Sequence, residues 1–253
     1  GIENLNLTPH LGASTAEAQE SVGVEIAEAI AEVLQGGRIR NAINMPSIDP
    51  KDLITLRPYL DLCHRLGSFA RQSAQENVSS IHISYWGGLV DFDAFPLSRA
   101  VQKGWLTGIA GDEGINDVNA PHKIKALGIK LDVTKSSSAV DYNELVEVKT
   151  VASDGSERSV KGTLLGKAND PRIVEVDGQA IEVRPVDLLL VVRNVDKPGI
   201  VGKLGTILGD HGVNIANMSL SRADCGELAL TICELDEEPD GNILSKLEAD
   251  SDI

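Results

Sequence analysis

The sequence predicts an α+β fold, in which amphipathic helices alternate with short strands. Residues 188–192 form a continuous apolar run, as a buried strand requires. A polar turn that ends in Pro198-Gly199 follows this run. Five apolar residues then recur at helical spacing: Ile200, Val201, Leu204, Ile207 and Leu208. Earlier in the chain, residues 78–85 alternate polar and apolar side chains, which is typical of a half-buried strand.

Residues 1–46 contain one strongly amphipathic helix. Ser14 and Glu17 have the spacing of a capping box, in which each side chain satisfies a backbone N–H group, so they predict the start of the helix. Gly36-Gly37 predicts its end. Its apolar residues fall on one face: Val22, Ile26, Ile30, Val33 and Leu34. No other part of the sequence is an obvious partner for that face.

Residues 47–183 indicate a mixed domain of helices and strands. Apolar spacing predicts three helices, over residues 52–74, 95–104 and 118–127. Strands are expected over residues 78–85, 144–152, 159–166, 172–176 and 180–183. Asp154-Gly155 and Asp177-Gly178 are typical of the tight turns that join antiparallel strands.

Residues 184–253 predict the order strand, helix, strand, strand, helix. Gly212 should end the first helix and Val213 should start the second strand. A turn over residues 221–226 and a third strand over residues 227–235 follow, and Pro239 opens a second helix that reaches about Glu248. The loop before the first helix lies beside free backbone N–H groups, and such a place holds a carboxylate well.

Composition excludes several classes of function. The net charge is −15, which argues against binding to nucleic acid or to an anionic membrane, because both need basic clusters. No run of 18 apolar residues predicts a membrane span, and no secretory leader is visible. The three cysteines (63, 225 and 233) and five scattered histidines have neither disulfide nor metal-ligand spacing. We therefore expect no metal and a reducing compartment such as the cytoplasm.

Two segments near the C-terminal end resemble the ACT domain, a ligand-sensing module with a ferredoxin-like βαββαβ fold. They are Asn194-x-Asp196-x-Pro198-Gly199 and Gly212-Val213-Asn214-Ile215. The resemblance implies that Asn194, Asp196 and Asn214 hold the amino and carboxylate groups of L-serine between two modules. Carboxamides both donate and accept hydrogen bonds, but Asn and Asp before Pro-Gly also shape ordinary loops. The sequence ends at Ile253 with no apolar run left for the last strand of that fold, so we expect a cut there.

The segment from Thr8 to Thr15 resembles the catalytic-histidine segment of the D-isomer-specific 2-hydroxyacid dehydrogenases. The full string is most similar to the long-form D-3-phosphoglycerate dehydrogenases, and residues 41–46 fit the same family. The resemblance implies that residues 1–46 are a remnant of a Rossmann-type catalytic domain. It also implies that residues 47–183 are an intervening, allosteric substrate-binding-like domain and that residues 184–253 are the ACT domain.

The resemblance also implies a proton-transfer role for one histidine and a candidate anion site. His10 would carry the hydroxyl proton while hydride passes to or from NAD, as an imidazole that titrates near neutral pH can. Its carboxylate and arginine partners would precede residue 1, and no Gly-x-Gly-x-x-Gly motif follows a strand here, so we expect this chain alone to be inactive. Arg172 and Arg184 are candidates for an anion site, since a guanidinium suits phosphate geometry, or are two solvated arginines.

Two functions remain open at this point. The first is the C-terminal, mainly regulatory part of an NAD-dependent dehydrogenase of serine biosynthesis. It would be a homo-oligomer joined through the ACT and intervening domains, in the cytoplasm or in an organelle stroma. The second is a free-standing ACT-type amino-acid sensor or assembly module without catalytic activity. The segment from Thr8 to Thr15 favours the first function, because a pure sensor has no reason to keep it.

Overall fold

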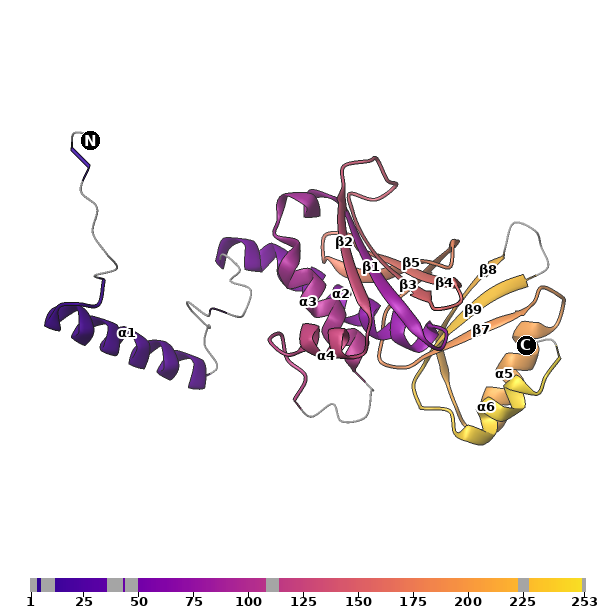
Figure 1. The fold of residues 1–253 in the computed structure, drawn as a ribbon. Coiled ribbons are helices and arrows are strands. Elements are labelled where there is room, and N and C mark those ends of the chain that lie inside the picture. Colours follow the sequence, from indigo (N-terminus) through magenta and orange to yellow (C-terminus); the bar gives the residue numbers. More distant parts are fainter. Residues whose placement is uncertain are drawn as a thin grey trace. The chain divides into compact units, whose positions relative to one another are not determined.

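The computed structural model describes residues 4–5, 12–35, 43, 50–107, 114–222 and 228–251. The chain divides into two compact units, residues 1–47 and residues 48–253. The second unit contains two sheets with their helices (Figure 1). His10, Gly36-Gly37, residues 41–42, residues 44–46 and Cys225, on which the sequence made predictions, lie outside the described residues.

The first unit holds helix α1 (Ala16–Leu34). The predicted capping box is wrong. Thr15, not Ser14, is the N-cap, and its hydroxyl accepts a hydrogen bond from the Ala18 N–H at 3.1 Å, whereas Glu17 is the second and not the third residue of the helix. Thr15 has the extended backbone that turns a side chain back toward the third helical N–H. No residue of α1 is buried, and Ile26 and Ile30 of the predicted apolar face are more than half exposed.

The second unit begins with a helical layer over a large sheet. Helices α2 (Pro50–Ser73) and α3 (Ala94–Leu106) pack on each other and on one face of the sheet, and α4 (Ala120–Ala126) contacts α3. A 3-10 turn, η1 (Gly88–Asp91), leads from the first strand to α3. The alternation predicted for residues 78–85 is confirmed, because Ile81, Ile83 and Tyr85 are fully buried between sheet and helices.

This sheet has six strands in the order β2-β1-β3-β4-β5-β6. Their bounds are β1 (Val78–Gly87), β2 (Lys130–Ser136), β3 (Glu144–Ala152), β4 (Glu157–Leu165), β5 (Asp170–Val176) and β6 (Gln179–Val183). β1 and β2 are parallel and all other neighbours are antiparallel. Asp177 and Gly178 have φ values of 50° and 81°, the left-handed pair that a two-residue hairpin turn requires, which confirms the predicted turn. The sequence missed β2.

The smaller sheet belongs to the C-terminal part of the same unit. It comprises β7 (Leu189–Val195), β8 (Ile215–Arg222) and β9 (Leu228–Leu235) in the order β7-β9-β8, all antiparallel. Helices α5 (Ile200–Asp210) and α6 (Gly241–Glu248) cover one face. This confirms the predicted strand, helix, strand, strand, helix order. Some boundaries were wrong. β8 begins at Ile215 and not at Val213, and it extends to Arg222, into the predicted turn; Asp240 rather than Pro239 caps α6.

The order β7-β9-β8 is that of the first, third and second strands of a ferredoxin-like sheet, as the ACT resemblance predicts. Gly212 has φ 75°, which confirms it as the residue that ends α5. Among the residues described, which end at Ser251, no strand follows α6. No helix in the described part of the chain is long and apolar enough to cross a membrane.

Candidate functional site

The end of β7 and the loop that follows it contain two of the three predicted effector residues. Asn194 is almost completely buried at the end of β7. Its Oδ1 accepts a hydrogen bond from the Thr231 hydroxyl at 3.2 Å, and its Nδ2 donates to the Val195 carbonyl at 2.9 Å. Its amide group therefore links the end of β7 to β9. Gly199, with φ 97°, then turns the chain into the first turn of α5.

Asp196 lies in the same loop and already has a cationic partner. Its carboxylate pairs with Nε of Arg222, the last residue of β8, at 3.0 Å. The Asp196 side chain is largely covered, whereas that of Arg222 is mostly exposed. An incoming ammonium group would therefore have to share Asp196 with the arginine or replace the arginine.

Asn214 lies at the opposite end of the small sheet. Its Nδ2 donates to Oδ2 of Asp236 at 2.6 Å, and its backbone N–H donates to Oε2 of Glu237 at 3.0 Å. Asn194 pairs with Ala229 on β9, whereas Ile215 pairs with Leu235. Those two positions on β9 are six residues apart, or about 20 Å of extended strand. A single module does not bring Asn194 and Asn214 together, so a ligand that touches both needs two modules.

The two arginines predicted to hold an anion do lie close together, but both already form ion pairs with acidic side chains. Asp170 pairs with Nη2 of Arg172 at 2.8 Å and with Nη2 of Arg184 at 3.4 Å, and Glu182 lies 3.4 Å from Nε of Arg172. The Asp170 hydrogen bond raises the pKa of Arg172, and the same contact lowers the pKa of Asp170. An anion would have to displace Asp170, which makes a solvated ion-pair cluster the simpler interpretation.

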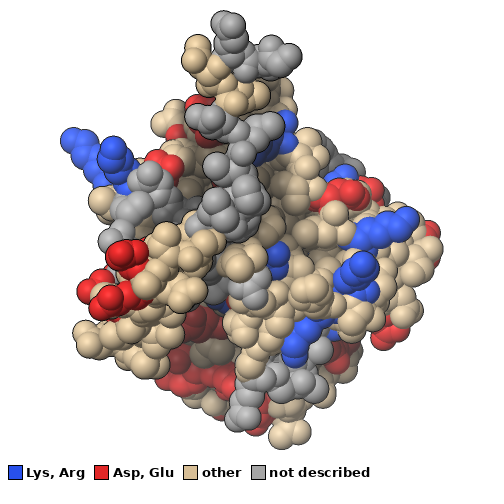
Figure 2. Space-filling model, turned by 60° about the vertical axis from the view of Figure 1, so that its left-hand side comes forward, with Lys and Arg blue, Asp and Glu red and all other residues tan. Residues whose placement is uncertain are grey.

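Charge is mixed on the wider surface as well. Figure 2 shows basic side chains in several separate groups on one face of the molecule, with acidic side chains elsewhere on that face. Interspersed charges allow local ion pairs such as those of Asp170 and Asp196. The prediction that the protein does not bind nucleic acid stays a prediction.

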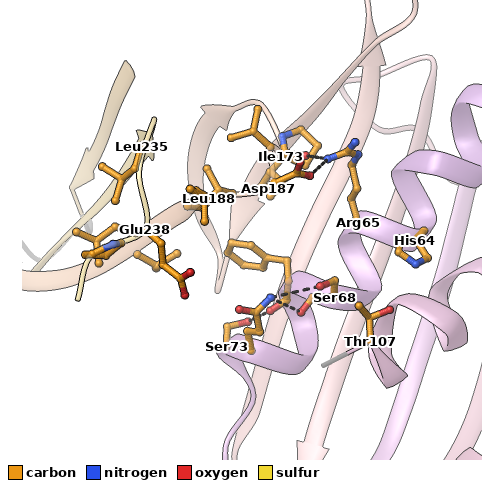
Figure 3. A pocket seen from close by; sticks show the side chains of 18 of the residues that line it. His64, Arg65, Ser68, Ser73, Thr107, Ile173, Asp187, Leu188, Leu235 and Glu238 are labelled. Atoms are coloured by element: carbon orange, nitrogen blue, oxygen red, sulfur yellow. Dashed lines mark hydrogen bonds and ion pairs between the residues drawn. The ribbon is translucent and has the colours of Figure 1, made fainter. Parts of the chain in front are cut away.

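A cavity that the sequence did not predict lies between α2 and the segment that leads into β7 (Figure 3). It has a volume of about 820 Å³, and residues 185–191 line it one after another. Arg65 crosses to this segment and donates from Nη1 to the Pro185 carbonyl at 2.6 Å and to Asp187 at 3.3 Å. Gln72 and Ser68 of α2 hydrogen-bond to each other on the same wall. Apolar and charged groups alternate around the cavity, so its lining indicates no single ligand class.

His64, on the α2 wall of this cavity, makes stability depend on pH. Burial, and then the charge of Lys103, lower the pKa of His64. Below about pH 6.5, the ordinary pKa of histidine, His64 binds a proton in the unfolded chain but not in the folded protein. The folded state is therefore destabilised as the pH falls, until the lower pKa of folded His64 is reached.

We therefore expect His64→Gln to flatten the fall in melting temperature between pH 7 and pH 5. His122→Gln changes an exposed histidine and serves as the control. Melting curves at half-unit pH steps measure both. Equal acid slopes for His64→Gln and the wild type would contradict the assignment.

Ser80, His82 and Asp132 lie in a line that the sequence did not reveal, on the helix-free face of the large sheet. The Ser80 hydroxyl is 3.0 Å from Nε2 of His82, and Nδ1 of His82 is 3.4 Å from Asp132. The order matches a nucleophile, a base and an orienting carboxylate. However, β1 pairs with strands on both sides, so the backbone N–H groups around Ser80 belong to ladders and are not free to stabilise an oxyanion. We interpret the line as a surface network.

No cluster of three or more metal-ligating side chains occurs among the described residues. Cys63 and Cys233 are buried free thiols, and burial raises the pKa of Cys233 to about 11 and that of Cys63 further. Neither thiol is therefore a reactive nucleophile near neutral pH.

Two family models match this chain. Residues 55–177 match the D-3-phosphoglycerate dehydrogenase intervening domain, and residues 188–252 match the ACT domain. Together the two models cover most of the chain, which therefore contains these two domains. In these terms β1 to β5 with α2 to α4 form the intervening domain, and β7 to α6 form the ACT domain. This confirms the resemblance on which the sequence interpretation depends.

Curated relatives carry the same family name. The chain is 39% identical over 248 residues to D-3-phosphoglycerate dehydrogenase of Synechocystis sp., which covers 97% of the chain and 44% of the relative. It is 34% identical over 247 residues to that of Methanocaldococcus jannaschii, which covers 98% of the chain and 46% of the relative. The chain therefore spans less than half the length of the curated relatives it matches, and it matches their C-terminal portion.

Proposed function

We propose that this chain is the regulatory part of an NAD-dependent D-3-phosphoglycerate dehydrogenase and that it senses L-serine. The observation that carries the proposal is the polar loop from Asn194 to Gly199, placed at the N-terminus of α5 inside an ACT domain. An α-helix N-terminus favours a carboxylate through its free N–H groups, and Asp196 beside it favours an ammonium. A free amino acid carries both groups.

A second copy of the chain completes the proposed site. Asn214 is about 20 Å of strand away from Asn194 within one module, so the Asn214 that meets the ligand comes from the partner. Asp196 would hold the ammonium and the two carboxamides would orient the serine hydroxyl and carboxylate. Serine can inhibit the enzyme only if it binds the inactive arrangement more tightly than the active one.

For the whole protein we propose oxidation of 3-phospho-D-glycerate to 3-phosphohydroxypyruvate, in the cytoplasm or an organelle stroma. NAD would supply the hydride acceptor. No strand here is followed by the glycine motif that cradles a dinucleotide, so we place NAD on no residue of this chain. From this chain, His10 would give or take the hydroxyl proton.

Titration calorimetry of the purified protein with L-serine tests the regulatory proposal. We expect saturable binding at millimolar or lower concentration, and a loss of about tenfold or more in affinity for Asp196→Asn or Asn214→Ala, because a hydrogen bond to a charged group is worth about 1.5–3 kcal/mol. Asn214 is exposed, and Asp196→Asn keeps the size of the largely covered Asp196 side chain, so both variants should keep the fold. Asn194→Ala is unsuitable because it leaves the buried Thr231 hydroxyl without its acceptor.

Asp141→Asn, between β2 and β3 of the intervening domain, is the matched control, since it removes the same charge from an exposed site away from both the loop and Asn214. It should bind serine as the wild type does. Absence of heat with the wild type at millimolar serine, in a folded dimer, would rule the proposal out. The alternative, a free-standing amino-acid sensor, predicts serine binding as well, and the mass of the native gene product separates the two.

A further inference from the structure

The ACT domain and the intervening domain share a hydrophobic core. Along β9, Cys233 and Leu235 face α5 and α6, whereas Leu230 and Ile232 point to the opposite side. Leu230 and Ile232 are completely buried in the cluster formed by the intervening domain, and Leu189 and Val191 of β7 pack against the same cluster. The helix-free face of the small sheet therefore lies on the intervening domain.

Polar contacts surround this shared core. The Ser219 hydroxyl on β8 donates to the Glu182 carbonyl on β6 at 2.6 Å, and the Arg184 N–H donates to Oε1 of Glu234 on β9 at 3.3 Å. The edge strand β6 of the large sheet thus lies beside the edge strand β8 of the small one. A displacement of the small sheet would have to break these contacts.

One carboxylate at this junction has three donors. Oδ1 of Asp177 accepts the Ser159 N–H at 2.8 Å, and Oδ2 pairs with Arg158 at 3.1 Å and also with Arg193. Ser159 and Arg158 belong to β4 of the intervening domain, whereas Arg193 belongs to β7 of the ACT domain. The Asp177-Gly178 turn fixes the position of the carboxylate, because both residues are held in left-handed conformations.

Arg193 directly precedes Asn194 on β7, and the two side chains point to opposite faces of the strand. Asn194 links the end of β7, where the candidate effector loop begins, to β9, and Arg193 contacts the intervening domain. Any ligand that repositions the end of β7 therefore acts on the Arg193–Asp177 contact. An exposed ion pair of this kind contributes little to the free energy of unfolding. The contact matters because of where it lies, between the end of β7 and the β5–β6 turn.

We propose that the Arg193–Asp177 contact couples the effector loop of the ACT domain to the β5–β6 turn of the intervening domain. The ligand part of this inference rests on the proposed function, whereas the mechanical coupling does not. When the contact is present, the end of β7 and the turn order each other. When it is broken, each side becomes more mobile, although the shared apolar core keeps the domains together.

Hydrogen exchange of the ligand-free protein tests the coupling. Arg193→Gln removes the contact between domains, and Arg158→Gln removes a contact of the same carboxylate inside the intervening domain. We expect Arg193→Gln to speed exchange at both β7 and the β5–β6 turn, and Arg158→Gln to speed it at the turn and β4 with β7 unchanged. Unchanged exchange at the turn in Arg193→Gln, or equal effects of both variants at β7, would overturn the proposal.

A second arm adds L-serine. In the wild type and in Arg158→Gln, serine should slow exchange at the β5–β6 turn. In Arg193→Gln that response should disappear, and serine affinity should fall by about two- to fivefold, the scale of an exposed ion pair. If serine slows exchange at the turn equally in Arg193→Gln, the contact is not the coupling element. If the wild type does not bind serine, the proposed function fails while the ligand-free arm still decides the coupling.

Discussion

Gly67→Ala is expected to lower the free energy of unfolding by about 3 kcal/mol, the upper part of the range for overpacked cores. Gly67 of α2 and Gly104 of α3 lie where these two helices pack against each other. A Cβ on Gly67 would lie 2.1 Å from the Val101 carbonyl oxygen, and one on Gly104 would lie 1.8 Å from the His64 carbonyl oxygen. Both obstacles are backbone atoms of a neighbouring helix, so no side-chain rotation relieves them. The helices must separate over the buried face of the sheet.

Gly205→Ala is the matched control for this prediction. Gly205 is also inside a helix, α5, but apart from its chain neighbours and the helix's own backbone no heavy atom lies within 4 Å of its added Cβ. There the substitution should stabilise the protein by about 0.5–1 kcal/mol, because alanine loses less backbone entropy than glycine. Urea denaturation followed by circular dichroism measures both variants. A Gly67→Ala variant as stable as the wild type would show that the helices do not approach this closely.

Periodic apolar spacing predicted most of this fold because most elements bury one face. The predicted strand over residues 144–152 agrees with β3 at both ends, and α2 and α5 differ from prediction by two residues or fewer at each end. β2 was not predicted because it does not bury one face. It is an edge strand of sequence Lys-Leu-Asp-Val-Thr-Lys-Ser, most of it exposed, so its pattern is set by pairing with β1 and not by burial.

Local chemistry predicted the turns better than the caps. Asp177-Gly178 needs two left-handed residues, and few residue types tolerate that conformation, so the sequence signal is strong. Either Ser14 or Thr15 could cap α1, and only the backbone angles decide that Thr15 does.

The candidate site was predictable in its residues but not in its contacts. The sequence identified Asn194, Asp196 and Asn214. It did not show that Thr231 hydrogen-bonds to Asn194 or that Arg222 pairs with Asp196. Arg65 was not identified at all, because its partner Pro185 is 120 residues away in the chain. Such long-range pairs depend on how the intervening and ACT domains pack, which no local pattern encodes.

That packing leads to a second large expected effect. Ile232→Ala should lower the free energy of unfolding by about 2–5 kcal/mol, since the truncation leaves a cavity at a fully buried position. Ile232 is on the middle strand of the ACT sheet but is buried against the intervening domain. The substitution should therefore destabilise both domains.

Tryptophan fluorescence makes this testable. Trp86 and Trp105 are the only tryptophans, and both lie in the intervening domain. If residues 48–253 unfold as the single compact unit that they form, Ile232→Ala in the ACT domain should shift the urea midpoint of the tryptophan signal. Leu204→Ala, in the core between α5 and the ACT sheet, should shift it as well. A Leu204→Ala variant that loses helical signal at lower urea, with the tryptophan midpoint unchanged, would show that the ACT domain unfolds separately and that the shared core does not unite the two domains.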